Sequence, residues 1–354
     1  MKAFFKYLFS KLAYGFIVLA GVIVIIFFLF TVLPGDPAQM TLGQRSDVQS
    51  LEAVRKDLGL DQPIYKQFLF YIKDLSPLSV EKKDHESQLK YHYIPLVSVS
   101  GQTTLVLKRP YLRRSYQTKR EVSEILGDTI PNTLILAFSA MVFATFIGII
   151  LGVYSALYKN TWVDKLFIGI SIFGVSAPSF FAGIIIAWFF GFVLHPYTGL
   201  NMTGSLFSYD PFQGKILDLR NLILPVLTLG LRPLSIIMQL TRSSMLDVLS
   251  QDYIRTARAK GLSENQVIFK HALKNALNPV LTAVSGWFAS LLAGSFFVEY
   301  IFGYNGLGKA TVDALELNDF PVVMGSILFV ASIFVLINVV VDALYALLDP
   351  RISL

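Results

Sequence analysis

The sequence predicts an all-α polytopic membrane protein. Hydrophobic residues make up 54% of the 354-residue chain and charged residues only 15%, against roughly a quarter charged in soluble domains. Charge-free runs also recur along the chain, and each is longer than the ~20 residues that a helix needs to cross the hydrocarbon core. We therefore expect six transmembrane helices. The runs lie between Lys11 and Asp36, Asp128 and Lys159, Lys165 and His195, Lys274 and Glu299, and Asp319 and Asp342, with a weaker one at 221–241.

The first run follows three lysines, so a cleaved signal peptide is one interpretation. Its apolar stretch is longer than a usual signal core and no small-x-small cleavage site follows, which favours a retained anchor. Lysines and arginines of short loops stay on the cytoplasmic side. Those before the first run, around 159–165 and within 242–274 then fall on one side, so both termini are expected in the cytoplasm. The net charge of +6 fits this orientation and does not indicate nucleic-acid binding, because the charges are spread over loops.

These segments divide the chain into three regions. Residues 1–35 form an N-terminal transmembrane helix, residues 36–128 an extracytoplasmic segment, and residues 129–354 a five-helix core with a cytoplasmic loop at 242–274. Within the second region, a turn at 34–37 should end the first helix, two short amphipathic helices are expected in 51–72, broken at Gly59 and Pro63, and a β-hairpin is expected in 75–117.

The stretch IFGYNGLGKAT at 301–311 nearly matches a phosphate-binding loop. Gly303, Gly308 and Lys309 have the GxxxxGK spacing, but Ala310 stands where Ser or Thr would hold magnesium, and no strand is expected before it. It also falls on the extracytoplasmic side, where ATP is scarce. We expect a tight re-entrant turn in which glycines supply positive φ angles.

The residue types and their spacing do not indicate catalysis or metal binding. The chain has no cysteine, and its four histidines lie on different loops without the spacing of metal ligands. The spans offer hydroxyl groups but no converging nucleophile and base. We therefore expect no catalytic residue, no metal and no cofactor.

The most informative stretch is 251–280, QDYIRTARAKGLSENQVIFKHALKNALNPV. A helical run should end at Gly261, and Ser263 with Gln266 forms a capping box for the next helix. In that helix an apolar face is expected at Phe269, Leu273, Ala276, Leu277 and Val280, with Lys270 and Lys274 facing away. A loop of this length with its own helices usually contacts a partner. The alternatives are a DNA-binding helix-turn-helix and an interfacial helix on anionic headgroups.

Several motifs together resemble a known family. YIRTARAKGLS at 253–263, HALKNALNPV, TRSSMLDVL and the terminal DALYALLDPRI are similar to the permease subunits of ATP-binding-cassette importers, in the dipeptide, oligopeptide and nickel branch. PGDP at 34–37, LGLDQPIY at 58–65, and NGLGK followed by DFPVV also match this branch. The resemblance covers nearly the whole chain. Residues 75–110 look like an insertion, and YLRRSY at 111–116 departs from the expected glycine-rich sequence.

The resemblance implies a protein that is not an enzyme but half of a transport pore in the inner membrane of a prokaryote. Its partners would be a second, similar permease, two ATPase subunits and an extracytoplasmic substrate-binding protein, with no nucleic acid. The loop would dock on an ATPase and transmit its closure. Arg255, Thr256 and Ala257 stand at the glutamate, alanine and alanine positions that name this loop, so the first two depart from the pattern. The docking residues would be Arg255, Thr256, Ala257, Gly261, Leu262, Ser263 and Leu273.

The translocation path is less visible in the sequence. Ser176, Pro178 and Ser179 indicate a kinked helix packed closely against neighbours or facing the path. Arg232 lies deep in a predicted span, where it could face a cavity and suit a peptide carboxylate, or snorkel to a helix end. Peptides are the leading substrate, with nickel chelates or other small solutes as alternatives. An ion-coupled secondary transporter is disfavoured because no acidic or histidine residue is apparent within the spans.

Overall fold

The computed structural model describes residues 2–32, 38, 52, 55–56, 59–99, 101–210, 212 and 214–348. The predicted turn at 34–37 and most of the first amphipathic helix of 51–72 lie outside these residues. The chain divides into two compact units. The first, called the helical unit, comprises Met1–Phe16, Thr129–Val312 and Val330–Leu354, and the second, called the sheet unit, comprises Ile17–Asp128 and Asp313–Phe329.

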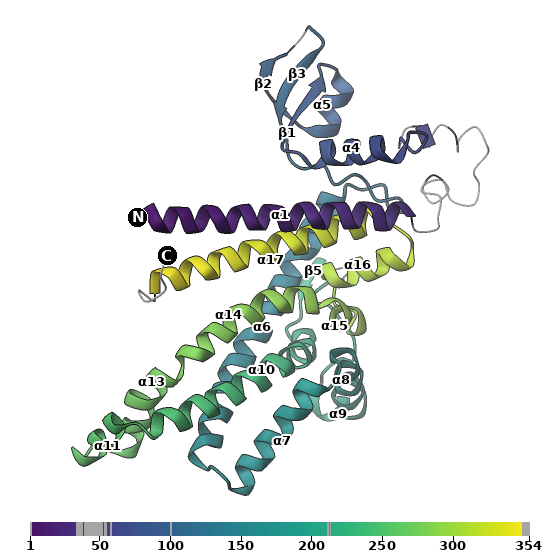
Figure 1. Cartoon of the computed structure of the whole chain (residues 1–354). Helices are drawn as coiled ribbons and strands as arrows, with labels where there is room; N and C mark the ends of the chain where they lie inside the picture. Colours follow the sequence, from purple (N-terminus) through teal and green to yellow (C-terminus); the bar gives the residue numbers. More distant parts are fainter. Residues whose placement is uncertain are drawn as a thin grey trace. The chain divides into compact units, whose positions relative to one another are not determined.

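Helices make up most of the described chain, and the strands are short. The elements in chain order are α1 (Lys2–Val32), α4 (Ile64–Leu75), β1 (Leu78–Lys82), α5 (His85–Tyr91), β2 (Ile94–Ser98), β3 (Thr103–Leu107), α6 (Val122–Leu157), α7 (Trp162–Ser176), α8 (Ser179–Ile186), the π-helical η2 (Ala187–Val193), α9 (His195–Thr198), β4 (Phe207–Asp210), β5 (Gly214–Leu217), α10 (Arg220–Leu249), α11 (Asp252–Ala259), α12 (Glu264–Gln266), the π-helical η3 (Val267–Ala272), α13 (Leu273–Ala276), α14 (Asn278–Gly294), α15 (Phe296–Ile301), α16 (Leu307–Glu316) and α17 (Phe320–Leu348) (Figure 1).

Within the described residues, four helices are each long and apolar enough to cross a membrane: α1, α6, α10 and α17. Two bent pairs bring the number to six if each pair is one span. One pair joins α7 to α8 and η2 through a bend of 113°, and the other joins the 264–276 helices to α14 through a bend of 51°. The helical membrane fold is thus confirmed, while six crossings stay a prediction.

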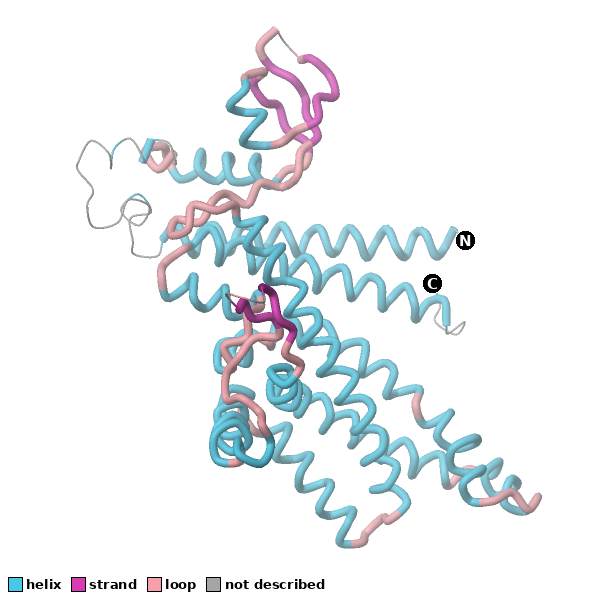
Figure 2. Tube along the Cα trace, turned by 180° about the vertical axis from the view of Figure 1, so that it is seen from behind, coloured by secondary structure: helices cyan, strands magenta, loops and turns pink. Residues whose placement is uncertain are grey.

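Helix α10 is the centre of the helical unit and packs on α7, α8 and α14 (Figures 1 and 2). The sequence signal for this helix is weak because Arg232 and Pro233 interrupt it, yet the helix continues unbroken for 30 residues. Neighbouring helices support the backbone where proline removes a hydrogen bond. Helix α6 approaches α10 at Gly148 and Gly152, where a Cβ atom on Gly152 would lie 2.7 Å from the Met238 carbonyl oxygen.

The sheet unit carries a three-stranded antiparallel sheet of order β1-β3-β2. The predicted hairpin corresponds to β2 and β3, and β1 was not expected because it pairs with β3 across more than twenty residues, for example Val80 with Leu105. Helix α4 begins after Pro63, as predicted, and packs its Phe68 and Tyr71 rings on Phe27 of α1.

A buried carboxylate, Glu81, links the sheet to α4. It accepts hydrogen bonds from Lys73 Nζ at 2.8 Å and Lys108 Nζ at 3.2 Å, and from Ser79 Oγ at 2.8 Å. Burial alone would raise the pKa of Glu81, but the hydrogen bonds from Lys73 and Ser79 outweigh it and hold the pKa below its ordinary value.

Candidate functional site

The 252–276 segment, which comprises α11, α12, η3 and α13, has the helix-turn-helix form that its sequence predicts. Gly261 follows α11 with a φ of +79°, and a Cβ atom built there would meet nothing within 4 Å. Ser263 and Gln266 form the predicted capping box. Across the turn, Arg258 Nε donates to Glu264 Oε1 at 2.9 Å. The turn is therefore fixed in conformation but open on its outer side.

The segment rests on the ends of two long helices. Ile254 and Ala257 of α11 are buried in one apolar cluster with Val153 of α6, Met245 of α10 and Val267 of η3. Each of these side chains is at most 7% exposed. A force on α11 would therefore reach α6 and α10 directly, because close-packed side chains transmit displacement.

The predicted apolar face of the second helix is wrong at Phe269, whose side chain is 61% exposed. The π-helical η3 inserts an extra residue per turn and rotates the face, so that Val267, Ile268 and Ala272 are buried in its place. Lys270 and Lys274 are exposed as expected.

The seven residues expected to dock a partner differ in exposure. Arg255, Thr256, Gly261 and Ser263 are exposed, and Leu262 and Leu273 are half-buried. Ala257, however, is 7% exposed and packs in the chain's own cluster, so its side chain holds α11 in place and does not face outward.

An ion pair next to this segment joins α7 to α10. Asp164 Oδ1 and Oδ2 each accept from the guanidinium of Arg242 at 2.7 Å. Asp164 also accepts from Ser155 Oγ of α6 at 2.5 Å and from the Asn160 amide at 2.9 Å. The carboxylate is thus held by α6, α10 and the turn before α7. Sequence reasoning missed it because its partner Arg242 lies in a different span.

A break in the third predicted span exposes a pocket beside α10. The kink expected at Pro178 is a complete interruption: α7 ends at Ser176, α8 begins at Ser179, and the two are bent by 113°. A cavity of about 90 Å³ lies against this break. It is lined by Gly174, Ala177, Ser179, Ala182, Thr228, Leu229, Leu231, Arg232, Pro233, Trp287, Ser290, Leu291 and Gly294.

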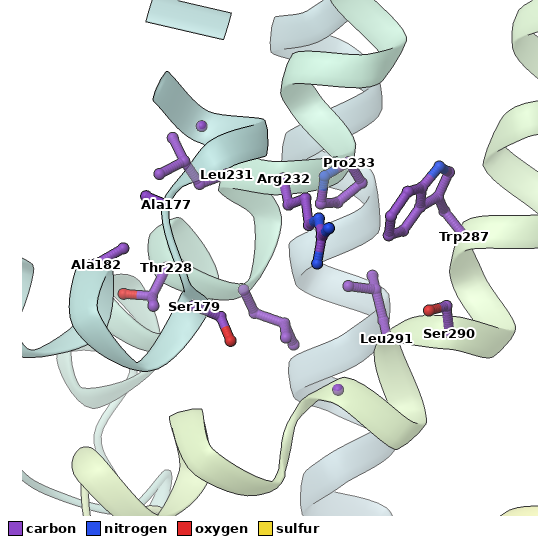
Figure 3. Close-up of a pocket in the computed structure, with 13 residues that line it drawn as sticks. Ala177, Ser179, Ala182, Thr228, Leu231, Arg232, Pro233, Trp287, Ser290 and Leu291 are labelled. Atoms are coloured by element: carbon purple, nitrogen blue, oxygen red, sulfur yellow. The ribbon is translucent and has the colours of Figure 1, made fainter. Parts of the chain in front are cut away.

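Two of the four residues expected on a translocation path, Ser179 and Arg232, line this pocket, and Ser176 and Pro178 sit at the break beside it. Figure 3 shows Arg232 reaching into the space, with Trp287 on one side and Ser179 on the other. Sequence reasoning missed Trp287 and Ser290. Both lie on α14, whose contact with α10 has no local signal.

The phosphate-loop-like stretch binds a carboxyl group of its own chain. Gly308 N and Lys309 N donate to Glu299 Oε2 at 2.7 and 3.2 Å, and Leu307 N donates to Thr133 Oγ1 at 2.8 Å. Helix α15, and no strand, precedes the glycines. The amides that would hold a phosphate in a nucleotide site are thus occupied by a carboxylate, which favours the predicted structural turn.

Comparison with known proteins agrees with the helical arrangement. Residues 148–354 match the family described as binding-protein-dependent transport system inner membrane component, and residues 4–137 match the N-terminal family of such membrane components. The chain is 36% identical over 350 residues to a dipeptide transport system permease protein of Alkalihalophilus pseudofirmus, covering 95% of this chain and 96% of that one.

A second relative is the glutathione transport system permease protein of Escherichia coli, 36% identical over 329 residues, with 93% of this chain and 92% of the relative covered. Among solved structures, an inward-facing form of the MetNI methionine ABC transporter superposes with a TM-score of 0.50 at 18% identity, over 64% of this chain and 97% of that one. The likeness to that structure supports the fold. Sequence match and fold together show that the chain belongs to the inner membrane permeases of binding-protein-dependent, ATP-binding-cassette importers.

Proposed function

We propose that the chain forms half of a membrane pore that imports short peptides. The observation that carries this proposal is its similarity, over more than nine-tenths of its length, to permeases named for dipeptide and for glutathione transport. These two substrates share a peptide backbone with a free carboxylate. Nickel chelates are the competing substrate class, and direct uptake assays separate the two.

The proposed assembly contains a second permease of the same family, two ATPase subunits and a substrate-binding protein outside the membrane. Both termini and the 242–274 loop face the cytoplasm, and residues 36–128 face outward. Loops rich in lysine and arginine on one side support this orientation. ATP hydrolysis would occur in the partner subunits and not in this chain.

The 252–276 segment is the proposed ATPase contact, through exposed Arg255, Thr256, Gly261 and Ser263 and half-buried Leu262 and Leu273. Its apolar cluster would pass a displacement to α6 and α10, and the Asp164–Arg242 pair would pass it on to α7. A partner shifts the pore only if it binds its two states differently. The surface that receives this segment must therefore move during the ATPase cycle.

The test uses Gly261→Asp with Gly199→Asp as its control. Both glycines have positive φ, +79° and +64°, and both have open space around a Cβ atom. Both variants thus acquire the same backbone strain and charge, at a cost of about 1 kcal/mol each. We expect both to reach the membrane with their partners, and only Gly261→Asp to lose uptake of a labelled dipeptide in proteoliposomes.

Normal uptake by Gly261→Asp would remove the docking assignment. Transport of a nickel chelate by the wild-type importer, without transport of any di- or tripeptide, would replace the peptide substrate by the alternative.

A further inference from the structure

The pocket beside α10 holds a cation without a counter-charge. Arg232 lies well inside α10, which is one of the helices apolar enough to span the membrane. No carboxylate of the described residues pairs with it. Its aromatic neighbour is the indole of Trp287, whose ring centroid lies 6.0 Å from the guanidinium carbon. Arginine stays protonated in proteins, so the charge at this place is permanent.

A charged side chain within a membrane span is costly unless it faces an interior cavity or pairs with an opposite charge. The face of a tryptophan ring attracts a cation but leaves most of its donors unused. Arginine offers five N–H donors in a planar fork that matches a carboxylate. The guanidinium of Arg232 therefore has hydrogen-bond donors without an acceptor among the described residues.

The remaining lining of the pocket is uncharged and consists of apolar residues, small residues and three hydroxyl side chains. Thr228 Oγ1 donates to the Leu224 carbonyl at 2.9 Å, so its proton is already used. Ser179 and Ser290 make no hydrogen bond to any described residue through their hydroxyl groups, and both are exposed to the pocket. A permanent cation, two available hydroxyls and no acid among the lining residues are the chemistry of an anion site.

The cavity, about 90 Å³, is too small for a whole dipeptide, since ligand pockets for small molecules usually exceed about 300 Å³. It has room for one terminal group. Ala177 and Gly294 leave this room because they carry little or no side chain, and a Cβ atom on Gly294 would meet nothing within 4 Å. A site of this size would recognise a feature common to all substrates and would not distinguish their side chains.

We propose that Arg232, with Ser179 and Ser290, binds the terminal carboxylate of a peptide as it passes through the pore, and that Trp287 holds the guanidinium in position for it. This inference rests on the proposed function, because it requires a carboxylate-bearing substrate. A carboxylate would replace the cation–π contact as the main partner of Arg232. It would also accept hydrogen bonds from the two serine hydroxyl groups.

The competing occupant is an acidic side chain of the second permease, which would make Arg232 part of a subunit interface. The two occupants differ in what depends on Arg232. A substrate site affects transport and its preference for a free carboxylate, whereas an interface pair affects assembly.

The experiment uses the complete importer with its partner permease, ATPases and binding protein in proteoliposomes. Uptake of a dipeptide and of the same dipeptide with its C-terminus amidated is measured, each rate being divided by the measured occupancy of the binding protein with that ligand. The variants are Arg232→Gln and Arg232→Lys. The matched control is Arg220→Gln, because Arg220 begins the same helix and pairs with Asp218 at 3.0 Å on its surface.

We expect Arg232→Gln to lower uptake of the free-carboxylate peptide about tenfold or more, because charge-assisted hydrogen bonds are lost. Uptake of the amidated peptide should change little, so that the preference for the free carboxylate disappears. Arg232→Lys should keep part of this preference, since it retains the charge but not the planar fork. Arg220→Gln and the basal ATPase rate of every variant should stay near the wild-type values.

Four results would overturn the proposal. Unchanged uptake in Arg232→Gln would remove any role in transport, and an equal fall for both peptides would assign Arg232 to structure. Loss of the second permease from the purified complex would assign the guanidinium to the subunit interface. A wild-type importer that takes up neither peptide would reject the proposed function itself, and this inference with it.

Discussion

The 252–276 segment and the glycine turn, residues 302–308, both reverse the chain through a glycine in the left-handed region. Gly261 has a φ of +79° and Gly303 one of +61°. The surroundings of the two turns are opposite. Nothing lies within 4 Å of a Cβ atom on Gly261, whereas a Cβ atom on Gly308 would lie 2.4 Å from the Phe296 Cα atom. Tyr304, in the same turn, is fully buried and donates through its hydroxyl to the Asn132 carbonyl.

The difference teaches that glycine serves two separate purposes in this chain. In the 252–276 segment it supplies only a backbone angle and leaves the outer face free. In the glycine turn only Gly303 has the expected positive φ. Gly306 and Gly308 do not, and they supply space instead, because neighbouring atoms occupy the positions of their side chains. Substitutions that add a single methyl group should therefore separate the two regions.

The largest effect is expected for Gly308→Ala. Alanine gains about 1 kcal/mol in helix propensity at α16, but the clash with the Phe296 backbone should cost about 3 kcal/mol and prevail. Unfolding of the purified full-length protein in mixed micelles would measure the loss. Gly127→Ala is the control, since Gly127 lies in α6 with nothing within 4 Å of a Cβ atom, and it should be neutral or slightly stabilising. Equal stability of the two variants would contradict the spatial role of Gly308.

The next effect concerns the carboxyl group of Glu299, which accepts hydrogen bonds from the glycine turn and α16. Glu299→Ala leaves the Gly308 and Lys309 amides without their acceptor, which should lower the free energy of unfolding by about 2 kcal/mol. Glu299→Gln keeps a carbonyl oxygen in that place and should lose less than about 1 kcal/mol. The same unfolding assay compares them. If both variants were equally destabilised, the acceptor would not be the feature that matters.

A smaller effect is expected for Gly261→Ala. The left-handed backbone alone should lower the free energy of unfolding by about 1 kcal/mol. Gly261→Asn should cost less, because asparagine tolerates this conformation better than alanine. Alanine adds little bulk and asparagine adds no charge, so partial peptide uptake should remain in both variants. A loss of stability as large as that of Gly308→Ala, measured by the same unfolding assay, would mean that the two turns do not differ as described.

The smallest effect is the pH dependence of the sheet unit, in which lysine ammonium groups and not backbone amides hold the carboxylate of Glu81. The pKa of Glu81 is lowered below its ordinary value of 4.5, so its ionised form stabilises the sheet unit above pH 4.5 and this contribution is lost as the pH falls through the lowered value. Hydrogen exchange of β1 and β3, corrected for intrinsic rates, should show weaker protection below that range. Glu81→Gln should abolish the pH dependence, and its persistence would point to another group.

The sequence predicts local features of this molecule well. The capping box of Ser263 and Gln266 and the positive φ of Gly261 depend on neighbouring residues, and the structure confirms them. Of the six spans expected from the charge-free runs, four are single helices long and apolar enough to cross a membrane, and the other two correspond to bent helix pairs in the described residues. The π-helical shift that exposes Phe269 is not visible in a 3.6-residue pattern. Pairings across the fold were also missed, such as Asp164 with Arg242 and Arg232 with Trp287, because their partners are set by helix packing and not by spacing along the chain.

Glu299 gives the phosphate-loop-like stretch a property that its letters do not reveal. A nucleotide-binding loop collects its anion from solution, so its occupancy follows the concentration of that ligand. Here the acceptor is a carboxyl group of the same chain, nine residues before Gly308, and a tethered group has a high effective concentration. The N-terminus of α16 is therefore occupied by this carboxyl group whatever the nucleotide concentration.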